Sequence, residues 1–241
     1  MKLYVVGFGC GSFGGMTEEA RQAIENSDLI VGYKVYTELL KQYFPQKEYF
    51  FTGMRQEKER VLYALEQAAS GRTVSLVCSG DSEVYGMAGL AYELSAMFPQ
   101  AEIQTVAGLT AALSGGALLG APLTHDFAVI SLSDLLTPAE KIALRLECAA
   151  KADFVIALYN PSSKKRPDYL KKACEIVLKF RSPETVCGYA KNIGRVGEEH
   201  GVMTLSKLVN FEADMFTTVF IGNSQTKIIN GKMVTPRGYD V

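Results

Sequence analysis

The fold of this chain is indicated near its N-terminus by the stretch LYVVGFGCGS at residues 3–12. A short apolar run that ends in closely spaced glycines is typical of a buried strand followed by a tight turn into a helix. The same order returns along the chain, where short β-branched or apolar runs alternate with longer amphipathic segments. This alternation predicts an α/β architecture with a largely parallel sheet.

The first half follows the alternation regularly. We expect its strands at residues 3–7, 29–31, 73–77 and 102–106, and its helices at residues 17–27, 55–69, 86–98 and 110–119. The sequence Gly120-Ala121-Pro122 then interrupts the pattern. We therefore predict an N-terminal domain over residues 1–120 and a C-terminal domain over residues 121–241.

The second half reads as a mixed sheet with fewer helices. We expect strands at residues 127–132, 154–159, 185–189, 203–205 and 217–221, and helices at residues 138–150 and 168–180. Thr137 and Glu140 have the spacing of a capping box, and Pro138 stands between them at the first helical position. The helix is therefore predicted to begin at Pro138.

The composition is that of an ordinary folded protein, with 48% hydrophobic and 21% charged residues over 241 positions. The 25 Lys and Arg residues nearly balance the 26 Asp and Glu residues, which gives a net charge of −1. A protein that works by neutralising nucleic-acid phosphates would carry a basic excess. We therefore predict no nucleic-acid partner.

Two further sequence features bear on metals and membranes. The five cysteines form no C-x-x-C pair, and the two histidines, His125 and His200, lie far apart, so we expect free thiols and no protein-bound metal. The longest apolar stretch, residues 111–123, is shorter than the roughly 20 residues that a membrane span needs. The first apolar run is too short for a signal peptide, so we expect a cytoplasmic protein with no membrane association.

Glycine- and asparagine-containing segments follow several of the predicted strands, at residues 7–12, 78–87, 107–111, 159–161 and 188–192. Ligands of open parallel sheets bind at the carboxyl ends of the strands, so these segments together predict a cleft. A dinucleotide fingerprint is disfavoured, because Ser12 replaces its third glycine. Each segment alone is also explained by turn geometry.

Several of these segments together resemble the tetrapyrrole methylases. The matching stretches are the G-x-G-x-G loop at residues 7–11, Ser79-Gly80-Asp81, the G-x-T-A segment at residues 108–111, GAPLTHDF at residues 120–127, and Tyr159-Asn160-Pro161. The resemblance implies a methyltransferase that uses S-adenosylmethionine. It also implies the two-domain tetrapyrrole methylase fold, with a mostly parallel N-terminal sheet, a mixed C-terminal sheet and the active-site cleft between them.

Four more stretches are similar to the branch that methylates C17 of precorrin-3B or cobalt-factor III in cobalamin and porphyrin biosynthesis. They are residues 31–33, 85–90, 130–138 and 235–239. The similarity implies a tetrapyrrole substrate, methylation with ring contraction, and a homodimer. Two alternatives stay open, namely methylation of another macrocycle carbon and a non-catalytic corrinoid-binding protein.

The resemblance also implies which residues contact the cofactor. From the first domain these are Cys10, Ser79, Gly80, Asp81, Val84, Thr110 and Ala111. Asn160 and Gly188 would close the adenine side from the second domain. The carbonyls of glycine-rich loops suit this ligand, because a sulfonium cation needs oxygen dipoles nearby and no adjacent cation.

The chain departs from the family pattern at two places. Cys10 stands where the family usually has proline, and Ser82-Glu83 stands where it usually has Pro-Gly or Ala-Gly. If position 83 required a positive φ, Glu83 would be strained. We would then expect a Ser82-Glu83 to Pro-Gly replacement to keep or improve cofactor affinity.

His125 is the candidate general acid or base, because imidazole titrates near neutral pH, although a lone histidine is more often structural. The carboxylates of a tetrapyrrole need cationic partners. The candidates for that role are Arg55, Lys58, Lys164, Lys165, Arg166, Lys191, Arg195 and Arg237. The sequence does not choose among them, since most charged runs are solvated faces.

Overall fold

A computed structural model describes residues 2–163 and 166–240. It divides into two compact units, Met1–Ala111 and Ala112–Val241. The division falls at the start of α5 (Ala111–Leu119), earlier than the predicted boundary after residue 120, because this helix packs on the second sheet. An added Cβ at Gly115 would lie 3.1 Å from the Ala190 Cβ and 3.2 Å from the Phe220 ring.

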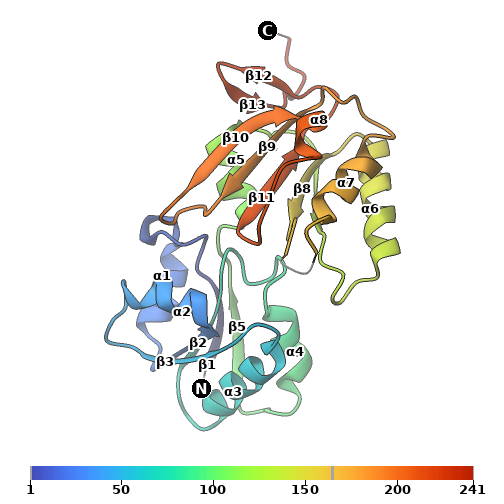
Figure 1. Cartoon of the computed structure of the whole chain (residues 1–241). Helices are drawn as coiled ribbons and strands as arrows, with labels where there is room; N and C mark the ends of the chain where they lie inside the picture. The colour runs from blue at the N-terminus through green and yellow to red at the C-terminus, as the bar shows by residue number, and fades with distance from the viewer. Residues whose placement is uncertain (1, 164–165, 241) are drawn as a thin grey trace. The chain divides into compact units, whose positions relative to one another are not determined.

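The first unit, coloured blue to green in Figure 1, contains an all-parallel five-stranded sheet. Its strand order is β3-β2-β4-β1-β5. Its strands are β1 (Lys2–Gly7), β2 (Leu29–Tyr33), β3 (Glu48–Thr52), β4 (Val74–Cys78) and β5 (Glu102–Val106). Its helices are η1 (Phe13–Gly15), α1 (Glu18–Glu25), α2 (Lys34–Lys41), α3 (Glu57–Ala69) and α4 (Ala88–Ser95). The predicted parallel sheet is confirmed.

Helices cover both faces of this sheet because its central strands are apolar on both sides. Val5 of β1 packs in one core with Val61 and Leu65 of α3. Val6, the next residue, packs in a second core with Ile24 of α1. Successive side chains of a strand point to opposite faces, so the continuous apolar run of β1 serves both layers.

The second unit contains a mixed five-stranded sheet in the order β10-β9-β11-β8-β7, as predicted. Its strands are β7 (Phe127–Ser131), β8 (Val155–Tyr159), β9 (Val186–Lys191), β10 (Glu199–Thr204) and β11 (Thr217–Ile221). Only β7 and β8 run parallel; the other pairings are antiparallel. The helices α6 (Ala139–Lys151), α7 (Tyr169–Val177) and α8 (Leu205–Leu208) contribute to one core with these strands.

A small sheet completes the second unit. It joins β6 (Gly120–Ala121), β12 (Lys227–Ile229) and β13 (Lys232–Val234) in the order β12-β13-β6. Within the described residues, no helix is both long and apolar enough to cross a membrane.

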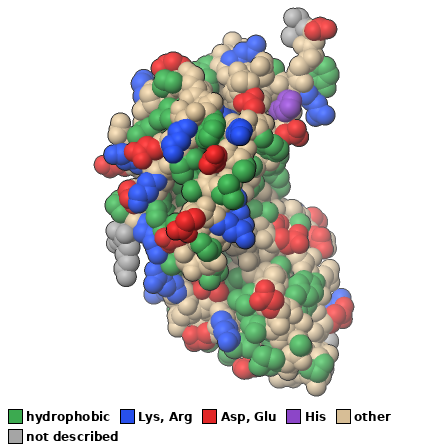
Figure 2. Space-filling view, turned by 90° about the vertical axis from the view of Figure 1, so that its right-hand side faces the viewer, with side chains coloured by type: hydrophobic (Ala, Val, Ile, Leu, Met, Phe, Trp, Pro, Cys, Tyr) green, Lys and Arg blue, Asp and Glu red, His purple; other side chains and the backbone are tan. Residues whose placement is uncertain are grey.

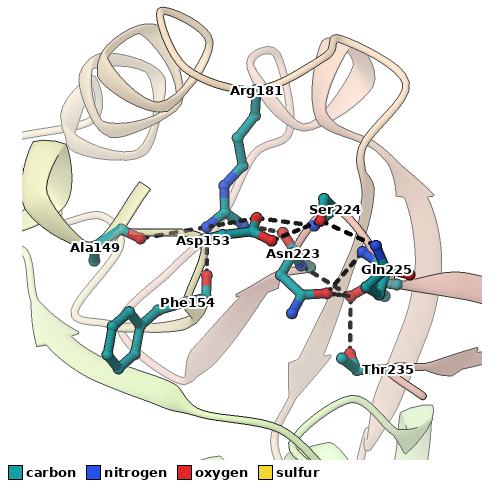
Figure 3. A network of polar contacts seen from close by, with 10 residues as sticks. Ala149, Asp153, Phe154, Arg181, Asn223, Ser224, Gln225 and Thr235 are labelled. Carbon is teal, nitrogen blue, oxygen red and sulfur yellow. Dashed lines mark hydrogen bonds and ion pairs between the residues drawn. The ribbon is translucent and has the colours of Figure 1, made fainter. Parts of the chain in front are cut away.

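Arg181 connects several segments of the second unit in a buried polar network (Figure 3). Its guanidinium donates to the backbone carbonyls of Ala149, Phe154 and Gly222, and one nitrogen lies 3.8 Å from the Asp153 carboxylate. Burial lowers the pKa of Arg181, although the nearby Asp153 acts in the opposite direction. The arrangement holds the end of α6, the start of β8 and the segment after β11 together.

Some sequence predictions differ from the structure. Helix α2 and strands β3, β12 and β13 were not predicted. The capping box at Thr137 is wrong, because Pro138 is the N-cap residue and no side chain caps α6. The predicted turn at residues 188–192 is also wrong over most of its length, because residues 188–191 belong to β9.

Candidate functional site

Two of the predicted glycine loops meet in the first unit. Strands β1 and β4 are parallel neighbours, so the loops that follow them begin at the same edge of the sheet. The Gly9 amide donates to the Gly80 carbonyl at 2.9 Å, and the Gly80 amide donates back to Gly9 at 2.7 Å. Both residues have φ values in the left-handed region, +77° and +75°, which favours glycine.

Asp81 ties a third loop to this pair. Its Oδ1 accepts from the amides of Glu83 and Val84 at 2.8 and 2.9 Å, and its Oδ2 accepts from the Gly108 amide at 2.9 Å. Gly108 follows β5, which pairs with β1. The carboxylate therefore connects the loops that follow β4 and β5.

The pKa of Asp81 reflects these contacts. Asp81 is buried, and burial alone raises the pKa of a carboxyl group. The surrounding backbone amides outweigh this effect and lower the pKa of Asp81 below its ordinary value of 3.8. The group is thus an ionised acceptor at neutral pH, with both oxygens engaged.

The three loops approach so closely that side chains would not fit between them. A Cβ at Gly108 would lie 2.2 Å from the Gly80 carbonyl oxygen and 2.3 Å from that of Gly7. A Cβ at Gly7 would lie 2.7 Å from the Asp81 Cα. These glycines therefore serve backbone packing at the carboxyl edge of the sheet.

The other predicted cofactor residues of the first unit lie on the same three loops, except Ala111, which is the first residue of α5. Cys10, Ser79, Val84, Thr110 and Ala111 are all partly exposed. The Cys10 thiol donates to the Leu109 carbonyl at 3.6 Å, so it joins the first loop to the third. The structure thus brings together the whole first-domain set that the sequence predicted.

The departure at Ser82-Glu83 causes no backbone strain. The non-glycine residue with a positive φ in this loop is Tyr85, at +57°, and Glu83 is not in the left-handed region. Ser82 is fully buried, and its hydroxyl donates to the Val106 carbonyl at 2.9 Å. The expectation that Pro-Gly at these positions would relieve strain is therefore wrong.

In the second unit, Tyr159 and Asn160 lie where β8 ends. The Ala112 amide donates to the Tyr159 hydroxyl at 2.6 Å, which satisfies one free donor at the start of α5. Asn160 has a φ of +53°, and its side chain donates to Ser131 at 2.9 Å, at the end of the parallel strand β7. Within the second unit, Tyr159 and Asn160 thus connect the end of β8 with the start of α5 and the end of β7.

Gly188 is placed differently from Asn160. It is buried inside β9, paired with Val202 on one side and Phe220 on the other. A Cβ at Gly188 would lie 2.7 Å from a methyl group of Leu119 on α5. The absence of a side chain at Gly188 therefore lets α5 pack on the sheet.

His125 lies before β7, whereas Asn160 follows β8. Because β7 and β8 are parallel, the two residues occupy opposite edges of the sheet. The His125 side chain is 47% exposed, its Nδ1 accepts from the Asp126 amide at 2.9 Å, and it lies 3.9 Å from the Asp126 carboxylate. Within the second unit, the structure does not bring His125 together with Asn160.

The predicted substrate-binding cations divide into three groups. Lys164 and Lys165 lie outside the described residues. Arg166 and Lys191 are already paired, with Asp134 at 2.8 Å and Asp214 at 3.1 Å, and Arg195 lies over the Phe216 ring. Arg55 and Lys58 line an open pocket of about 560 Å³ beside α3, and Arg237 is exposed near the C-terminus.

Arg60 is a buried charged residue that the sequence analysis did not single out. It is 3% exposed and donates to the Thr52 hydroxyl at 3.0 Å, the Gly53 carbonyl at 2.8 Å and the Met87 sulfur at 3.5 Å. Burial lowers the pKa of Arg60. The sequence signal was its position four residues before Ala64 on the apolar face of α3, where a charged side chain is unusual.

Charges of both signs are interspersed over the surface that Figure 2 shows. No continuous basic stripe crosses the described residues of that face. Likewise, the described residues contain no group of three or more His, Cys, Asp or Glu side chains arranged to hold a metal ion.

The family model for tetrapyrrole (corrin/porphyrin) methylases matches residues 2–209. The match extends through the first unit and into the second as far as residue 209, and it includes the loops at Gly9, Asp81, Gly108 and Asn160. The chain belongs to the tetrapyrrole methylase family. The enzyme is therefore a methyltransferase.

Two curated relatives of this tetrapyrrole methylase are similar along its whole length. The cobalt-factor III methyltransferase of Priestia megaterium is 46% identical over 243 residues; the match covers 99% of this chain but 45% of that relative. The probable cobalt-factor III C(17)-methyltransferase of Methanocaldococcus jannaschii is 46% identical over 245 residues, covering 98% of this chain and 97% of the relative.

Solved structures show the same fold. The crystal structure of the methyltransferase CobJ superimposes with a TM-score of 0.89 and 35% identity, covering 97% of this chain and 99% of that one. Uroporphyrin-III C-methyl transferase from Thermus thermophilus, complexed with S-adenyl homocysteine, matches with a TM-score of 0.73, 18% identity and coverage of 92% and 97%. At that identity, the second match shows the fold alone.

Proposed function

We propose that this tetrapyrrole methylase transfers a methyl group from S-adenosylmethionine to C17 of precorrin-3B or cobalt-factor III, with ring contraction, in cobalamin biosynthesis. One observation carries the proposal: the chain is 46% identical to a probable cobalt-factor III C(17)-methyltransferase, and the match covers 97% of that relative's length. The CobJ match supports it, since both units of the chain take part.

The three loops of the first unit suit the methyl donor chemically. Residues 79–86 and 107–111 contain no Lys or Arg, and Asp81 adds a buried anion. A sulfonium group is favoured by carboxylate and carbonyl oxygens and disfavoured by cations. We assign Cys10, Ser79, Gly80, Asp81, Val84, Thr110 and Ala111 to the donor site, and Asn160 to the adenine side.

The donor supplies an electrophilic methyl group for an in-line displacement by a macrocycle carbon. The protein's part in that step is mainly to orient the reactants and exclude water. Gly80 and Gly108 let the three loops approach one another closely, and Asp81 connects two of these loops through its hydrogen bonds. This chemistry requires no protein-bound metal, so cobalt is treated as part of the substrate. A homodimer in the cytoplasm is the proposed assembly and location.

The first experiment is calorimetric titration with S-adenosylmethionine and S-adenosylhomocysteine. Wild-type protein should bind both, whereas Gly80→Val should abolish binding while the chain stays folded, because a β-branched residue is disfavoured at a φ of +75°. Gly231 has the same φ of +75°, and a Cβ added there would have no neighbouring atom within 4 Å. Gly231→Val is therefore the matched control for backbone strain alone. Unchanged affinity in Gly80→Val would show that the loop is assigned wrongly.

The second experiment incubates the protein with S-adenosylmethionine and precorrin-3B or cobalt-factor III. Mass spectrometry should show one added methyl group, and NMR should place it on C17 of a contracted ring. A methyl group on another carbon would refute the branch assignment. Binding without methyl transfer would indicate a corrinoid-binding protein.

A further inference from the structure

The donor loops occupy only part of the carboxyl edge of the first sheet. They follow β4, β1 and β5, which are adjacent in the strand order. The two remaining strands, β2 and β3, end at the same edge because all five strands run parallel. The segment at residues 53–56, here called the β3 loop, therefore begins at the edge where the donor loops begin.

Arg60 ties the β3 loop to the loop that follows β4. Its guanidinium donates to the Thr52 hydroxyl and the Gly53 carbonyl at the end of β3, and to the Met87 sulfur just before α4. It also lies 5.8 Å from the centre of the Tyr33 ring, at the end of β2. One buried side chain thus joins the ends of β2 and β3 to the candidate donor site.

The positive charge of Arg60 has no counter-ion within the described part of the chain. Its partners are a hydroxyl, a carbonyl, a thioether and an aromatic ring, and it forms no ion pair. The Glu57 charge favours the guanidinium, but burial outweighs it and lowers the pKa of Arg60. Buried guanidinium groups usually face a carboxylate. This end of the edge therefore attracts an anion.

Arg55 adds a second positive charge on the β3 loop. It is exposed and forms no hydrogen bond or ion pair with any residue that the structure describes. The turn around it is closed, because the Gly53 amide donates to the Gln56 side-chain oxygen at 2.7 Å and the Gly53 carbonyl accepts from Arg60. The nearby Glu59 carboxylate accepts from the Gln56 amide at 2.8 Å. The loop thus fixes the backbone of Arg55 and leaves its guanidinium accessible.

Arg55 is favoured over the other candidate cations of the described residues. Two of them are already paired with carboxylates, and a third lies over an aromatic ring. Lys58 and Arg237 are exposed, but neither belongs to the loop that Arg60 holds. A guanidinium can also bind both oxygens of a carboxylate, whereas an ammonium acts as a point charge.

We propose that Arg55 is a substrate-contact residue that binds a peripheral carboxylate of the tetrapyrrole, and that Arg60 is a positioning residue that holds the β3 loop for it. This inference rests on the proposed function. Negatively charged side chains of the macrocycle bind at the β2–β3 part of the edge, where Arg55 and Arg60 lie. The cationic methyl donor binds at the part that carries Asp81. Charges of opposite sign thus separate substrate and donor along one sheet edge.

The contact is tested by titrating purified full-length variants with cobalt-factor III and with S-adenosylmethionine. Arg55→Gln should weaken cobalt-factor III binding by about 5- to 50-fold, because it removes a charge-assisted contact, and should leave S-adenosylmethionine binding unchanged. Arg55→Asn also removes the charge but suits the φ of +66°, so it should lose the same affinity without a lower Tm. The difference between wild type and Arg55→Gln should narrow at high salt, which screens exposed charges.

The positioning role of Arg60 is tested in a double-mutant cycle. In an Arg60→Met background the β3 loop is no longer held, so Arg55→Gln should weaken cobalt-factor III binding by less than about twofold. Thr52→Val removes one acceptor of Arg60 at nearly constant volume, and it should reduce the effect of Arg55→Gln in part. A purely structural Arg60 would lower the Tm but leave the effect of Arg55→Gln unchanged in both backgrounds, which would overturn the positioning role.

Arg145→Gln is the matched control, because Arg145 is exposed on α6 and has no assigned role. It should bind both ligands like wild type at every salt concentration. Wild-type affinity for cobalt-factor III in both Arg55→Gln and Arg55→Asn would overturn the inference and leave methyl transfer standing. Lost affinity for S-adenosylmethionine alone would overturn it by assigning Arg55 to the donor. A wild-type protein that does not bind cobalt-factor III would overturn the proposed function itself.

Discussion

Asp81 shows how one side chain can hold the loops of a candidate site together. Its oxygens accept three backbone amides drawn from two loops. In Asp81→Asn, the amide oxygen can still accept hydrogen bonds from the Glu83 and Val84 amides. The new NH₂ group then faces the Gly108 amide, and because both groups are donors, that hydrogen bond is lost. We expect a loss of about 1–3 kcal/mol in the free energy of unfolding and at least tenfold weaker binding of S-adenosylmethionine.

The pH dependence of this effect follows from the lowered pKa of Asp81. A depressed folded-state pKa gives stability that is present above the ordinary value of 3.8 and is lost as the pH falls through the folded value. Urea unfolding should therefore show that wild type and Asp81→Asn differ in their free energy of unfolding by a constant amount from pH 5 to 8. This difference should shrink in stronger acid. Asp126→Asn, with its side chain 81% exposed, is the control and should match wild type. Equal stability of Asp81→Asn and wild type at pH 7 would refute the loop-organising role.

His125 gives a second prediction at the scale of one residue. A strand of five residues spans roughly 17 Å, and His125 and Asn160 lie beyond opposite ends of the paired strands β7 and β8. We therefore expect His125→Ala to methylate at a rate within about threefold of wild type, with unchanged cofactor affinity. The sequence-based hypothesis of a general acid or base instead requires a fall of about 10²-fold or more. Single-turnover rates with saturating donor decide between them.

At the scale of elements, the packing of α5 on β9 depends on Gly188. Gly188→Ala would place a methyl group 2.7 Å from Leu119, so we expect a loss of about 1–3 kcal/mol in stability. Leu119→Ala would remove the clashing side chain, and the double variant should lose less than the sum of the two single losses. Thermal unfolding of all four proteins measures this coupling.

The same variants test the role of Gly188 at the adenine side. If Gly188 serves packing alone, folded Gly188→Ala should bind S-adenosylmethionine with nearly wild-type affinity at 25 °C. A loss greater than tenfold would support the sequence-based assignment to the cofactor instead.

The elements that were predicted from sequence are those with strong local signals. The strands Glu102–Val106 and Thr217–Ile221 agree residue for residue with the structure. Helix α2 was missed because it follows β2 without a loop and no side chain caps it. Strand β9 was predicted to end at residue 189, but pairing with both β10 and β11 extends it to Lys191. Such tertiary pairing leaves no local signal.

At the scale of the whole molecule, some residues around the candidate site were predicted from the sequence and others were not. The first-unit residues were predicted from the resemblance to the tetrapyrrole methylases, whose matching motifs lie in short loops after strands. Arg60 was missed because only the fold shows that Thr52, Gly53 and Met87 surround it. Tyr85 was known as part of a motif, but its left-handed backbone has no sequence signature outside Gly, Asn and Asp.

The separation of the chain into two uninterrupted units also has a consequence for its biosynthesis. A ribosome makes the first unit completely before it reaches Ala112, and domains generally fold in that order. The last partner of Asp81 is Gly108, so every hydrogen bond of Asp81 that joins these loops can form before the second sheet is completely translated. The nascent chain thus carries the three connected loops of the first unit in an ordered form early in its synthesis.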